Sequence, residues 1–270
     1  MRIRALVVAS SGALALSALA VPAAQAAPTA APNVTFSAMK VNAGKAVVVG
    51  PSAKVTVTAT YTVTKPASLS ASSFDSGPML YRGASLGVNS EIIAGDEPGT
   101  CKTVSTTVLS CTAKIQFRPT ASSAYDDLAN SQAGTWKVGA LALPHDAAAE
   151  TDLKWQSNLG AVNVQRQAQL TADATPEPVK KGKTLTITGK LTRANWDTNK
   201  LGGYAAQPVK LQFKKKGSTT YTTVKTVKTS STGALKTTVK AAADGYYRYS
   251  FAGTTTTPAV SAAGDFVDVK

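Results

Sequence analysis

The most distinctive chemistry in this sequence is a run of positive charge over residues 209–240. The stretch reads VKLQFKKKGSTTYTTVKTVKTSSTGALKTTVK and contains eight lysines and no carboxylate. The eight are Lys210, Lys214, Lys215, Lys216, Lys225, Lys228, Lys236 and Lys240. Ammonium groups at this density attract anionic polymers through their summed electrostatic potential, and this attraction requires no sequence motif. The stretch is therefore a candidate basic surface.

Three interpretations of this basic surface are open. Nucleic acid is the least favoured, because surfaces that bind single strands combine Lys and Arg with stacking aromatic side chains. Only Tyr221 interleaves with these lysines, and arginine is scarce. Anionic cell-wall polymers such as teichoic acids need nothing beyond positive potential. The plainest alternative is the solvated face of a β-sheet, which keeps the protein soluble.

An acidic loop around residue 150 suggests a second kind of site. Asp146, Glu150 and Asp152 lie close together in HDAAAETD. Calcium takes loop carboxylates and backbone carbonyls as its ligands. The alternative is a solvated acidic loop, because three carboxylates in one flexible loop bind weakly unless other ligands converge. Calcium binding is thus the alternative function, and no other cofactor is expected.

Hydrolytic chemistry depends on residues that this sequence supplies sparingly. The single histidine is His145, and GASLG matches the G-x-S-x-G pattern around Ser85. That pattern is meaningful at a strand–turn–helix junction, and no helix is predicted after it. Glycoside hydrolysis needs two carboxyl groups facing each other across a cleft, whereas the acidic pairs at 96–97 and 126–127 are sequence neighbours. We expect a non-enzymatic protein and rank a secreted hydrolase third.

The two cysteines, Cys101 and Cys111, occur in the short segment CKTVSTTVLSC. An even pair at this spacing predicts one disulfide in an oxidising compartment. If STT turns the chain, CKTV and VLSC run antiparallel with the cysteines opposite each other. Closing so short a loop stabilises the folded state by about 2–3 kcal/mol on the chain-entropy estimate. A zinc site would need more ligands than two thiols and one histidine.

The first 26 residues have the features of a secretory signal peptide. Arg2 and Arg4 precede an apolar, alanine-rich stretch, and Ala24-Gln25-Ala26 matches the small-x-small cleavage pattern. The apolar stretch is too short for a membrane span, and no second one follows it. We therefore expect residues 27–270 to be secreted, loosely associated with the cell wall, and monomeric.

Charge divides the rest of the chain into two parts. From Pro176 onward there are 16 Lys and Arg against 5 Asp and Glu, whereas residues 27–175 have 11 against 10. A chain of this length suits one large or two medium domains, and the charge asymmetry favours two. We predict an N-terminal domain at 27–167, which contains the disulfide, and a basic C-terminal domain at 168–270.

Alternation with a period of two residues predicts strands through most of both domains. In residues 54–64, KVTVTATYTVT, apolar side chains share one parity and threonines share the other, which is typical of a half-buried strand. Residues 135–143, TWKVGALAL, are apolar on both parities. The one helical candidate, residues 123–132, is expected to form a single turn. Short strands separated by Gly, Pro, Asn and Ser predict an all-β fold of two Ig-like antiparallel β-sandwiches.

The same alternation places the basic surface and the aromatic residues of the C-terminal domain. Across 208–217 and 233–241 the lysines alternate with apolar residues, so they are expected to face solvent, where they also discourage aggregation between sheets. Val224 and Val227 are three residues apart and cannot share a face, which predicts either a β-bulge or a switch of the strand between sheets. Tyr247, Tyr249 and Phe251 share a parity and are expected in the core, and Tyr246 is expected to brace the adjacent corner.

Long segments of the C-terminal domain carry a family resemblance. They are ATPEPVKKGKTLTITGKLTRANWDTNK, QPVKLQFKKKGSTTYTTVKTVKT and DGYYRYSFAGTTTTPAVSAAGDFVDVK. Through them, residues 170–270 resemble an Ig-like domain of secreted proteins of filamentous actinobacteria, and AGTWKVGALA is similar to the same proteins. The resemblance implies an exported, two-domain Ig-like protein. Some relatives are labelled calcium-binding, but this sequence lacks the D-x-[DN]-x-[DN]-G loop onto which ligands could be carried over.

Overall fold

The computed structural model describes residues 30–119 and 128–270, so the predicted signal peptide at 1–26 lies outside the described residues. Two compact units make up the chain. The first unit comprises the chain up to Gly44, Thr56–Gln116 and Trp136–Ala161, and the second comprises Lys45–Val55, Phe117–Thr135 and Val162–Lys270. The domain boundary that we placed after residue 167 stays a prediction.

Helical structure in the described residues is limited to three short 3-10 turns. They are η1 (Asn42–Gly44), η2 (Asn130–Gln132) and η3 (Glu150–Asp152). The second of these falls at the end of the predicted helical turn, whose earlier part lies outside the described residues. Across residues 30–119 and 128–270, no helix has the length and apolar character that a membrane span requires.

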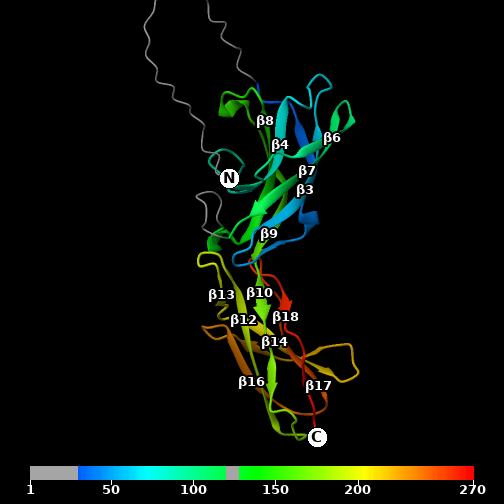
Figure 1. Cartoon of the computed structure of the whole chain (residues 1–270), viewed down its shortest axis with the longest axis vertical. Helices are drawn as coiled ribbons and strands as arrows, with labels where there is room; N and C mark the ends of the chain where they lie inside the picture. Colours follow the sequence, from blue (N-terminus) through cyan, green and yellow to red (C-terminus); the bar gives the residue numbers. More distant parts are fainter. Residues whose placement is uncertain (1–29, 120–127) are drawn as a thin grey trace, which may run out of the picture. The chain divides into compact units, whose positions relative to one another are not determined.

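Two sheets formed by β1 to β9 account for the N-terminal sandwich (Figure 1). The four-stranded sheet has the order β1 (Thr35–Val41), β3 (Val55–Thr64), β7 (Val108–Phe117) and β6 (Thr100–Ser105). The five-stranded sheet has the order β2 (Val47–Val49), β9 (Lys154–Arg166), β8 (Gly134–Pro144), β4 (Phe74–Arg82) and β5 (Glu91–Ala94). The pairing of β2 with β9 is parallel and therefore departs from the antiparallel pattern that we predicted.

The predicted alternation accounts for the packing of β3. Val57, Ala59, Tyr61 and Val63 are buried, whereas the threonines between them are exposed or half-buried. Along β8 the run Val138–Ala142 is buried on both parities, as its apolar composition predicted, whereas Thr135, Lys137 and Leu143 are exposed. The period-two pattern therefore identified both a strand with one solvated face and a strand enclosed in the sandwich.

The predicted disulfide hairpin is present. β6 and β7 pair antiparallel with Cys101 opposite Cys111, and their sulfur atoms are bonded. Thr106 and Thr107 form the turn between the two strands. Both cysteines belong to the same sheet, so the bond links neighbouring strands and does not link the two layers of the sandwich.

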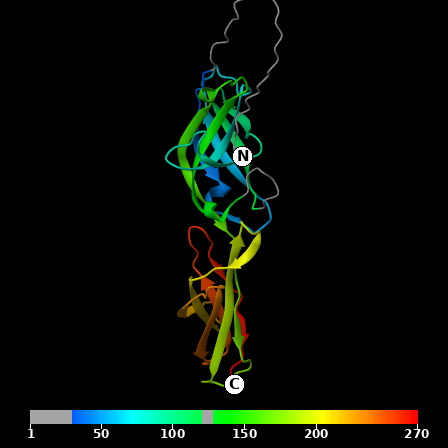
Figure 2. The ribbon, with the colours of Figure 1, turned by 90° about the vertical axis from the view of Figure 1, so that its left-hand side faces the viewer.

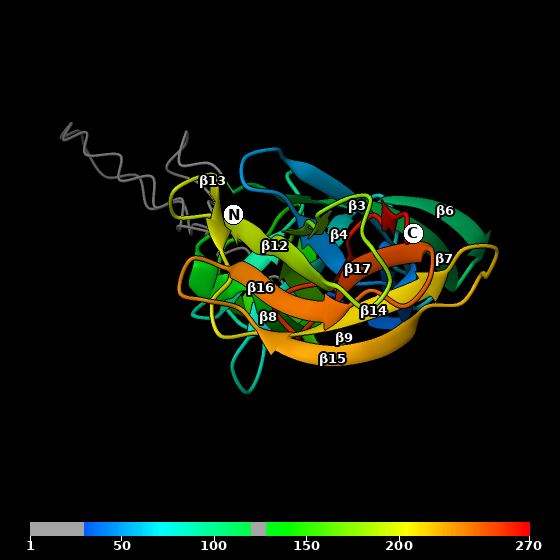
Figure 3. The same cartoon turned by 90° about the horizontal axis from the view of Figure 1, so that it is seen from below.

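The C-terminal sandwich likewise consists of two sheets, and here each sheet has five strands. One contains β10 (Ala168–Leu170), β11 (Asp173–Thr175), β12 (Thr184–Asn195), β13 (Lys200–Gly203) and β16 (Ala234–Lys240). The other contains β14 (Pro208–Lys215), β15 (Thr222–Lys228), β17 (Gly245–Phe251), β18 (Val260–Ser261) and β19 (Asp265–Val267). Figure 2 shows this sandwich from the side, and Figure 3 shows it from below, with β12 and β16 adjacent and β15 next to β14.

Apolar side chains from both sheets fill the space between them. Leu185 and Ile187 of β12 pack in one cluster with Leu211 of β14 and Tyr249 of β17, and all four are fully buried. The predicted bulge is also present, because the register of β14 and β15 shifts so that Val224 has no partner residue. Together these observations confirm an all-β protein built from Ig-like β-sandwiches.

Candidate polyanion-binding surface

The basic surface begins with the local pattern of β14. Val209 and Leu211 are completely buried, so the intervening side chain of Lys210 and the following Lys214 project from the outer side of the sheet. Lys210 is exposed and Lys214 is half-buried. Lys215 and Lys216 follow at the end of the strand, and both are exposed.

The lysines of β16 project from the other side of the sandwich. Leu235 is buried in the same core as Leu211, and Lys236 and Lys240 alternate with it on the exposed face. Because β14 and β16 belong to opposite sheets around one core, their outward lysines point in opposite directions. The eight predicted lysines therefore lie on two faces and along an edge, and do not form one continuous surface.

We call the outward side of β12 and β16 the threonine face. It carries Lys236 and Lys240 among threonines, and the residues opposite them on β12 are Thr188 and Thr184. Lys240 donates a hydrogen bond from Nζ to Thr184 Oγ1 at 3.0 Å. Lys190 of β12 is exposed on the same side, and the rest of the face presents small hydroxyl side chains and no aromatic ring on β12 or β16.

Lys225 and Lys228 lie on β15, at the edge of the sheet. The ammonium of Lys225 donates to Thr238 O at 2.7 Å and to Thr237 Oγ1 at 3.3 Å, and both acceptors belong to β16. Lys225 therefore joins the edges of the two sheets, and its charge has a structural partner. Lys228 is exposed at the end of the same strand.

The outward side of the β14 sheet carries a cluster that sequence reasoning did not find. Lys214 and Gln212 of β14 lie opposite Tyr246 and Arg248 of β17. The Lys214 ammonium is 4.6 Å from the centre of the Tyr246 ring and 5.1 Å from that of Tyr221. The guanidinium carbon of Arg248 is 3.7 Å from the centre of the Tyr221 ring. These are cation–π distances, so each ring holds at least one cation in place.

A third ring, Phe266 of β19, extends the cluster. Its centre is 5.2 Å from that of Tyr246, and Lys216 Nζ is 5.5 Å from the Phe266 centre. We define the aromatic face by its five central residues, which are Lys214, Tyr221, Tyr246, Arg248 and Phe266. Tyr246 thus belongs to an outward cluster through its contacts with Lys214 and Phe266, and its role in bracing the adjacent corner stays a prediction.

Two neighbouring residues fix the edges of the aromatic face. A Cβ atom on Gly264 would lie 2.2 Å from Tyr221 Oη, so the glycine leaves the space in which the tyrosine hydroxyl sits. Asp244 accepts hydrogen bonds from the Val269 amide at 2.9 Å and from Lys216 Nζ at 3.5 Å. The amide hydrogen bond and the nearby ammonium hold the pKa of this carboxyl below its usual range.

In the acidic loop that suggested calcium binding, the Asp152 carboxylate is hydrogen-bonded to the backbone of the loop. Asp152 Oδ2 accepts the backbone N–H groups of Ala148 and Ala149, each at 2.8 Å. These two hydrogen bonds lower the pKa of Asp152. In the described residues no group of three or more His, Cys, Asp or Glu side chains converges as metal ligands would. Calcium binding through Asp146, Glu150 and Asp152 stays a prediction.

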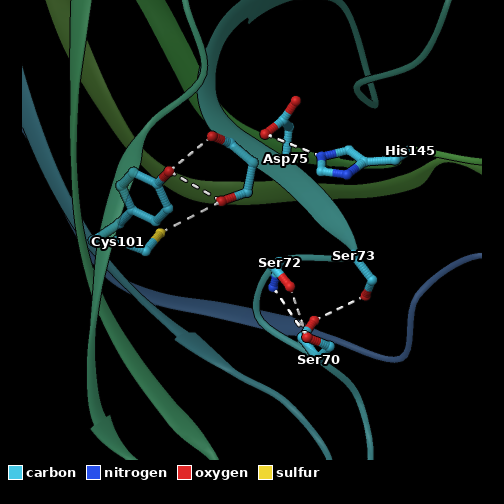
Figure 4. Close-up of polar contacts among 8 residues, drawn as sticks. Ser70, Ser72, Ser73, Asp75, Cys101 and His145 are labelled. Atoms are coloured by element: carbon cyan, nitrogen blue, oxygen red, sulfur yellow. Dashed lines mark hydrogen bonds and ion pairs between the residues drawn. The ribbon is translucent and has the colours of Figure 1, made fainter.

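The residues considered for hydrolysis lie far apart. Pro144, which precedes His145, pairs with Phe74 at the start of β4, whereas Ser85 follows the opposite end of this nine-residue strand. Strand length alone separates them by about 26 Å. Figure 4 shows His145 directed toward Asp75, with 3.4 Å between Nε2 and Oδ1. Nothing in this arrangement activates Ser85.

Other serines lie near His145 but bond among themselves. Ser73 Oγ donates to Ser70 O at 2.8 Å, and the hydroxyls of Ser70 and Ser72 are 2.9 Å apart (Figure 4). In the described part of the chain none of these hydroxyls is hydrogen-bonded to His145. A nucleophile and base would have to be in contact, so the loop lacks that arrangement.

Comparison with known proteins gives a likeness in fold. No protein-family model matches the chain, and no curated protein matches it. Among solved structures, the D0-D1 domain of intimin is 15% identical, with 86% of this chain and 97% of that chain covered and a TM-score of 0.26. Mouse nectin-like molecule 4 is 15% identical over 89% of this chain and 65% of that one, with a TM-score of 0.25.

A bacterial surface protein is among the other structures that are similar. The Yersinia pseudotuberculosis adhesin InvE is 9% identical over 87% of this chain and 58% of its own, with a TM-score of 0.27. At identities and TM-scores this low, the likeness carries no argument about ligand or activity. The candidate surface therefore rests on its own geometry.

Proposed function

We propose that this protein is an exported, non-enzymatic binding protein whose basic C-terminal sandwich contacts anionic polymers of the cell envelope. The observation that carries the proposal is an excess of cations without acidic partners. From Pro176 onward, 16 Lys and Arg accompany 5 Asp and Glu. Among the eight lysines of the basic surface, Lys216 is the one with an ion pair to a carboxylate in the described residues.

Exposed, unneutralised cations on both faces of a sandwich create a positive potential around it. Lys210, Lys236 and Lys240 are exposed, and no residue of 30–119 or 128–270 covers their side of either sheet closely enough to bury them. A polymer with repeated negative charges meets several ammonium groups at once, so weak contacts add together. Such binding needs no enclosed pocket.

Two further features support an extracellular location. The disulfide between Cys101 and Cys111 is typical of proteins that fold in an oxidising compartment. The N-terminal 26 residues have the sequence features of a secretory signal. A secreted monomer with a basic sandwich would remain on the outer surface through its charge.

The proposal is tested by sedimenting the full chain with isolated cell walls at two salt concentrations. We expect strong retention at about 0.1 M salt and loss at about 1 M, because the Debye length falls from about 10 Å to about 3 Å. Replacing one lysine on each face, Lys210→Gln with Lys236→Gln, should weaken retention. The matched control, Lys40→Gln with Lys102→Gln, removes two exposed charges from the first unit and should leave retention nearly unchanged.

Two results would contradict the proposal. The first is absence of binding to walls at low salt, and the second is binding that does not respond to salt. Equal loss in the two lysine variants would show that net charge matters but the C-terminal sandwich does not, which would also contradict the assignment of the contact surface.

A further inference from the structure

We propose that the aromatic face is a binding site for an acidic polysaccharide whose sugars carry carboxylates. This inference rests on the proposed function and gives it a specific ligand class and a specific face. The two outward faces of the C-terminal sandwich both carry lysines, yet rings accompany them on one face alone.

The rings hold the cations in fixed positions. Lys214 lies within 5.1 Å of two ring centres, and Arg248 stacks on Tyr221 at 3.7 Å. A free lysine or arginine side chain loses rotamer freedom when a ligand binds, and this loss opposes binding. Cations already held over rings lose less of this freedom, so they bind an anion more tightly than mobile lysines do.

These cations have donors left for an anion. Neither Lys214 nor Arg248 forms an ion pair with a carboxylate in the described residues. Arg248 donates from Nε to Gln212 Oε1 at 2.9 Å, which orients the guanidinium and leaves its terminal nitrogens available. A guanidinium fork matches a planar carboxylate with two parallel hydrogen bonds. A carboxylate-bearing sugar supplies that group. Phosphate oxygens fit the same fork, so the rings, which can pack against a sugar but not against a bare phosphate chain, are what favour a sugar acid.

The rings also suit the remainder of a sugar. Tyr221, Tyr246 and Phe266 are each half-buried, so part of every ring is open to a ligand. The hydroxyls of Tyr221 and Tyr246 make no hydrogen bond to other described residues, and both can bond to sugar hydroxyls. A sugar ring presents C–H groups and hydroxyls to such a surface. Its carboxylate would then reach Lys214 or Arg248.

The same geometry disfavours nucleic acid. Base stacking requires an open ring face, because single-strand binding depends on bases lying flat on aromatic side chains. The Arg248 guanidinium already occupies one face of Tyr221 at van der Waals distance, and Lys214 sits over Tyr246. Fewer ring faces are therefore open to a stacking base, whereas the tyrosine hydroxyls and the cations remain partners for a polyhydroxylated acid.

The test compares ligands on the full chain by biosensor titration at about 0.15 M salt, where surface charge is partly screened. The ligands are polygalacturonate, inorganic polyphosphate, oligo-deoxythymidine and neutral dextran. The variant Tyr221→Ala with Tyr246→Ala leaves net charge unchanged. We expect it to weaken polygalacturonate binding by about tenfold and polyphosphate binding by less than about twofold.

Two further variants separate the possible causes. Arg248→Lys keeps the charge and removes the fork, so it should weaken polygalacturonate binding by about threefold to tenfold. Lys40→Gln with Lys102→Gln lowers the charge of the first unit and should change polygalacturonate binding by less than about twofold. Thermal unfolding of each variant checks that the sandwich is intact, and Arg248→Lys keeps the test decisive if the double alanine variant fails to fold.

The outcomes are distinguishable. If no polyanion binds even at low salt, the proposed function fails. If polyanions bind but the tyrosine and arginine variants bind polygalacturonate as the unmodified chain does, the aromatic face is not the site, and the proposed function stands on charge alone. Tighter binding of polyphosphate or oligo-deoxythymidine than of polygalacturonate would overturn the ligand class.

Discussion

Two edge strands, β6 in the N-terminal sandwich and β15 in the C-terminal sandwich, are held in place by different kinds of contact. Each ends its sheet, and each is exposed along its length apart from one half-buried residue, Cys101 in β6 and Val227 in β15. Neither strand can be held by burial of apolar side chains. In β6 the tether is the disulfide to β7, and in β15 it is Lys225, which reaches Thr238 O on the opposite sheet.

β6 and β15 are held by contacts of different strength, although the interiors of the two sandwiches are built alike. In both sandwiches a buried tyrosine hydroxyl bonds to a backbone carbonyl of the facing sheet. Tyr61 of β3 donates to Ser76 O of β4 at 2.9 Å, and Tyr249 of β17 donates to Ile187 O of β12 at 3.0 Å. The layers are therefore joined by the same kind of contact, and the difference is confined to the edges.

Removal of the disulfide should give the largest effect. The variant Cys101→Ser with Cys111→Ser is expected to lose about 2–3 kcal/mol of unfolding free energy, because the unfolded chain regains the freedom of the closed loop. Denaturant unfolding followed by tryptophan fluorescence measures this loss. The unmodified protein under reducing conditions is the control and should behave as the double variant does. Unchanged unfolding in both would show that the exposed strand β6 needs no tether.

The tyrosine contacts should give intermediate effects. Tyr249→Phe removes one buried hydrogen bond, which is expected to cost about 1 kcal/mol. Tyr61→Phe also removes the contact of Tyr61 Oη with Ser76 Oγ at 3.1 Å, so its cost should be at least as large. A markedly smaller loss for Tyr61→Phe than for Tyr249→Phe, measured by the same denaturant titration, would contradict the view that the interiors are alike.

The same tyrosines predict a response to alkaline pH. Burial raises the pKa of Tyr249 to about 12 and also raises that of Tyr61. An unfolded tyrosine has a pKa near 10, so between pH about 10 and about 12 the unfolded state releases its proton first and stability falls. Below pH about 10 the contribution is complete. Tyr249→Phe should lose stability less steeply than the unmodified protein over this interval, since lysine titration is common to both.

Much of the architecture followed from local pattern. Alternation identified β3 and β14, the spacing of Val224 and Val227 located the bulge, and the cysteine spacing identified the β6–β7 hairpin. These features depend on residues within one strand or one turn, where the period of two fixes which side chains share a face.

The candidate site depended on contacts that sequence does not display. Alternation showed that lysines of β14 and β16 face solvent, but the assignment of these strands to opposite sheets comes from long-range pairing. The aromatic face likewise depends on long-range strand pairing. Tyr221 precedes β15 and Phe266 lies on β19, and they meet because β17 pairs with both β14 and β19. The parity of Tyr246, opposite to that of the core residue Tyr247, was the one available signal.

Replacing Lys225 should give the smallest effect and tests the weaker tether. Lys225→Met keeps most of the side-chain length but removes the bonds to Thr238 O and Thr237 Oγ1, so it is expected to cost about 0.5 kcal/mol, as exposed hydrogen bonds contribute little. The effect on local opening of β15 should be larger than the effect on the unfolding free energy of the protein. Amides of Thr222–Lys228 should exchange hydrogen faster, because opening of an edge strand requires only local unfolding.

Lys228→Met is the matched control for this change, because Lys228 is exposed on the same strand and its ammonium group makes no hydrogen bond to the described residues. It removes the same charge from the same edge. If both variants accelerate exchange equally, the loss of charge is responsible and Lys225 is not a tether. If only Lys225→Met accelerates exchange, the tether of β15 is a single ammonium group, whereas that of β6 is a covalent bond. The edge at β15 should then open before the edge at β6 as denaturant is added.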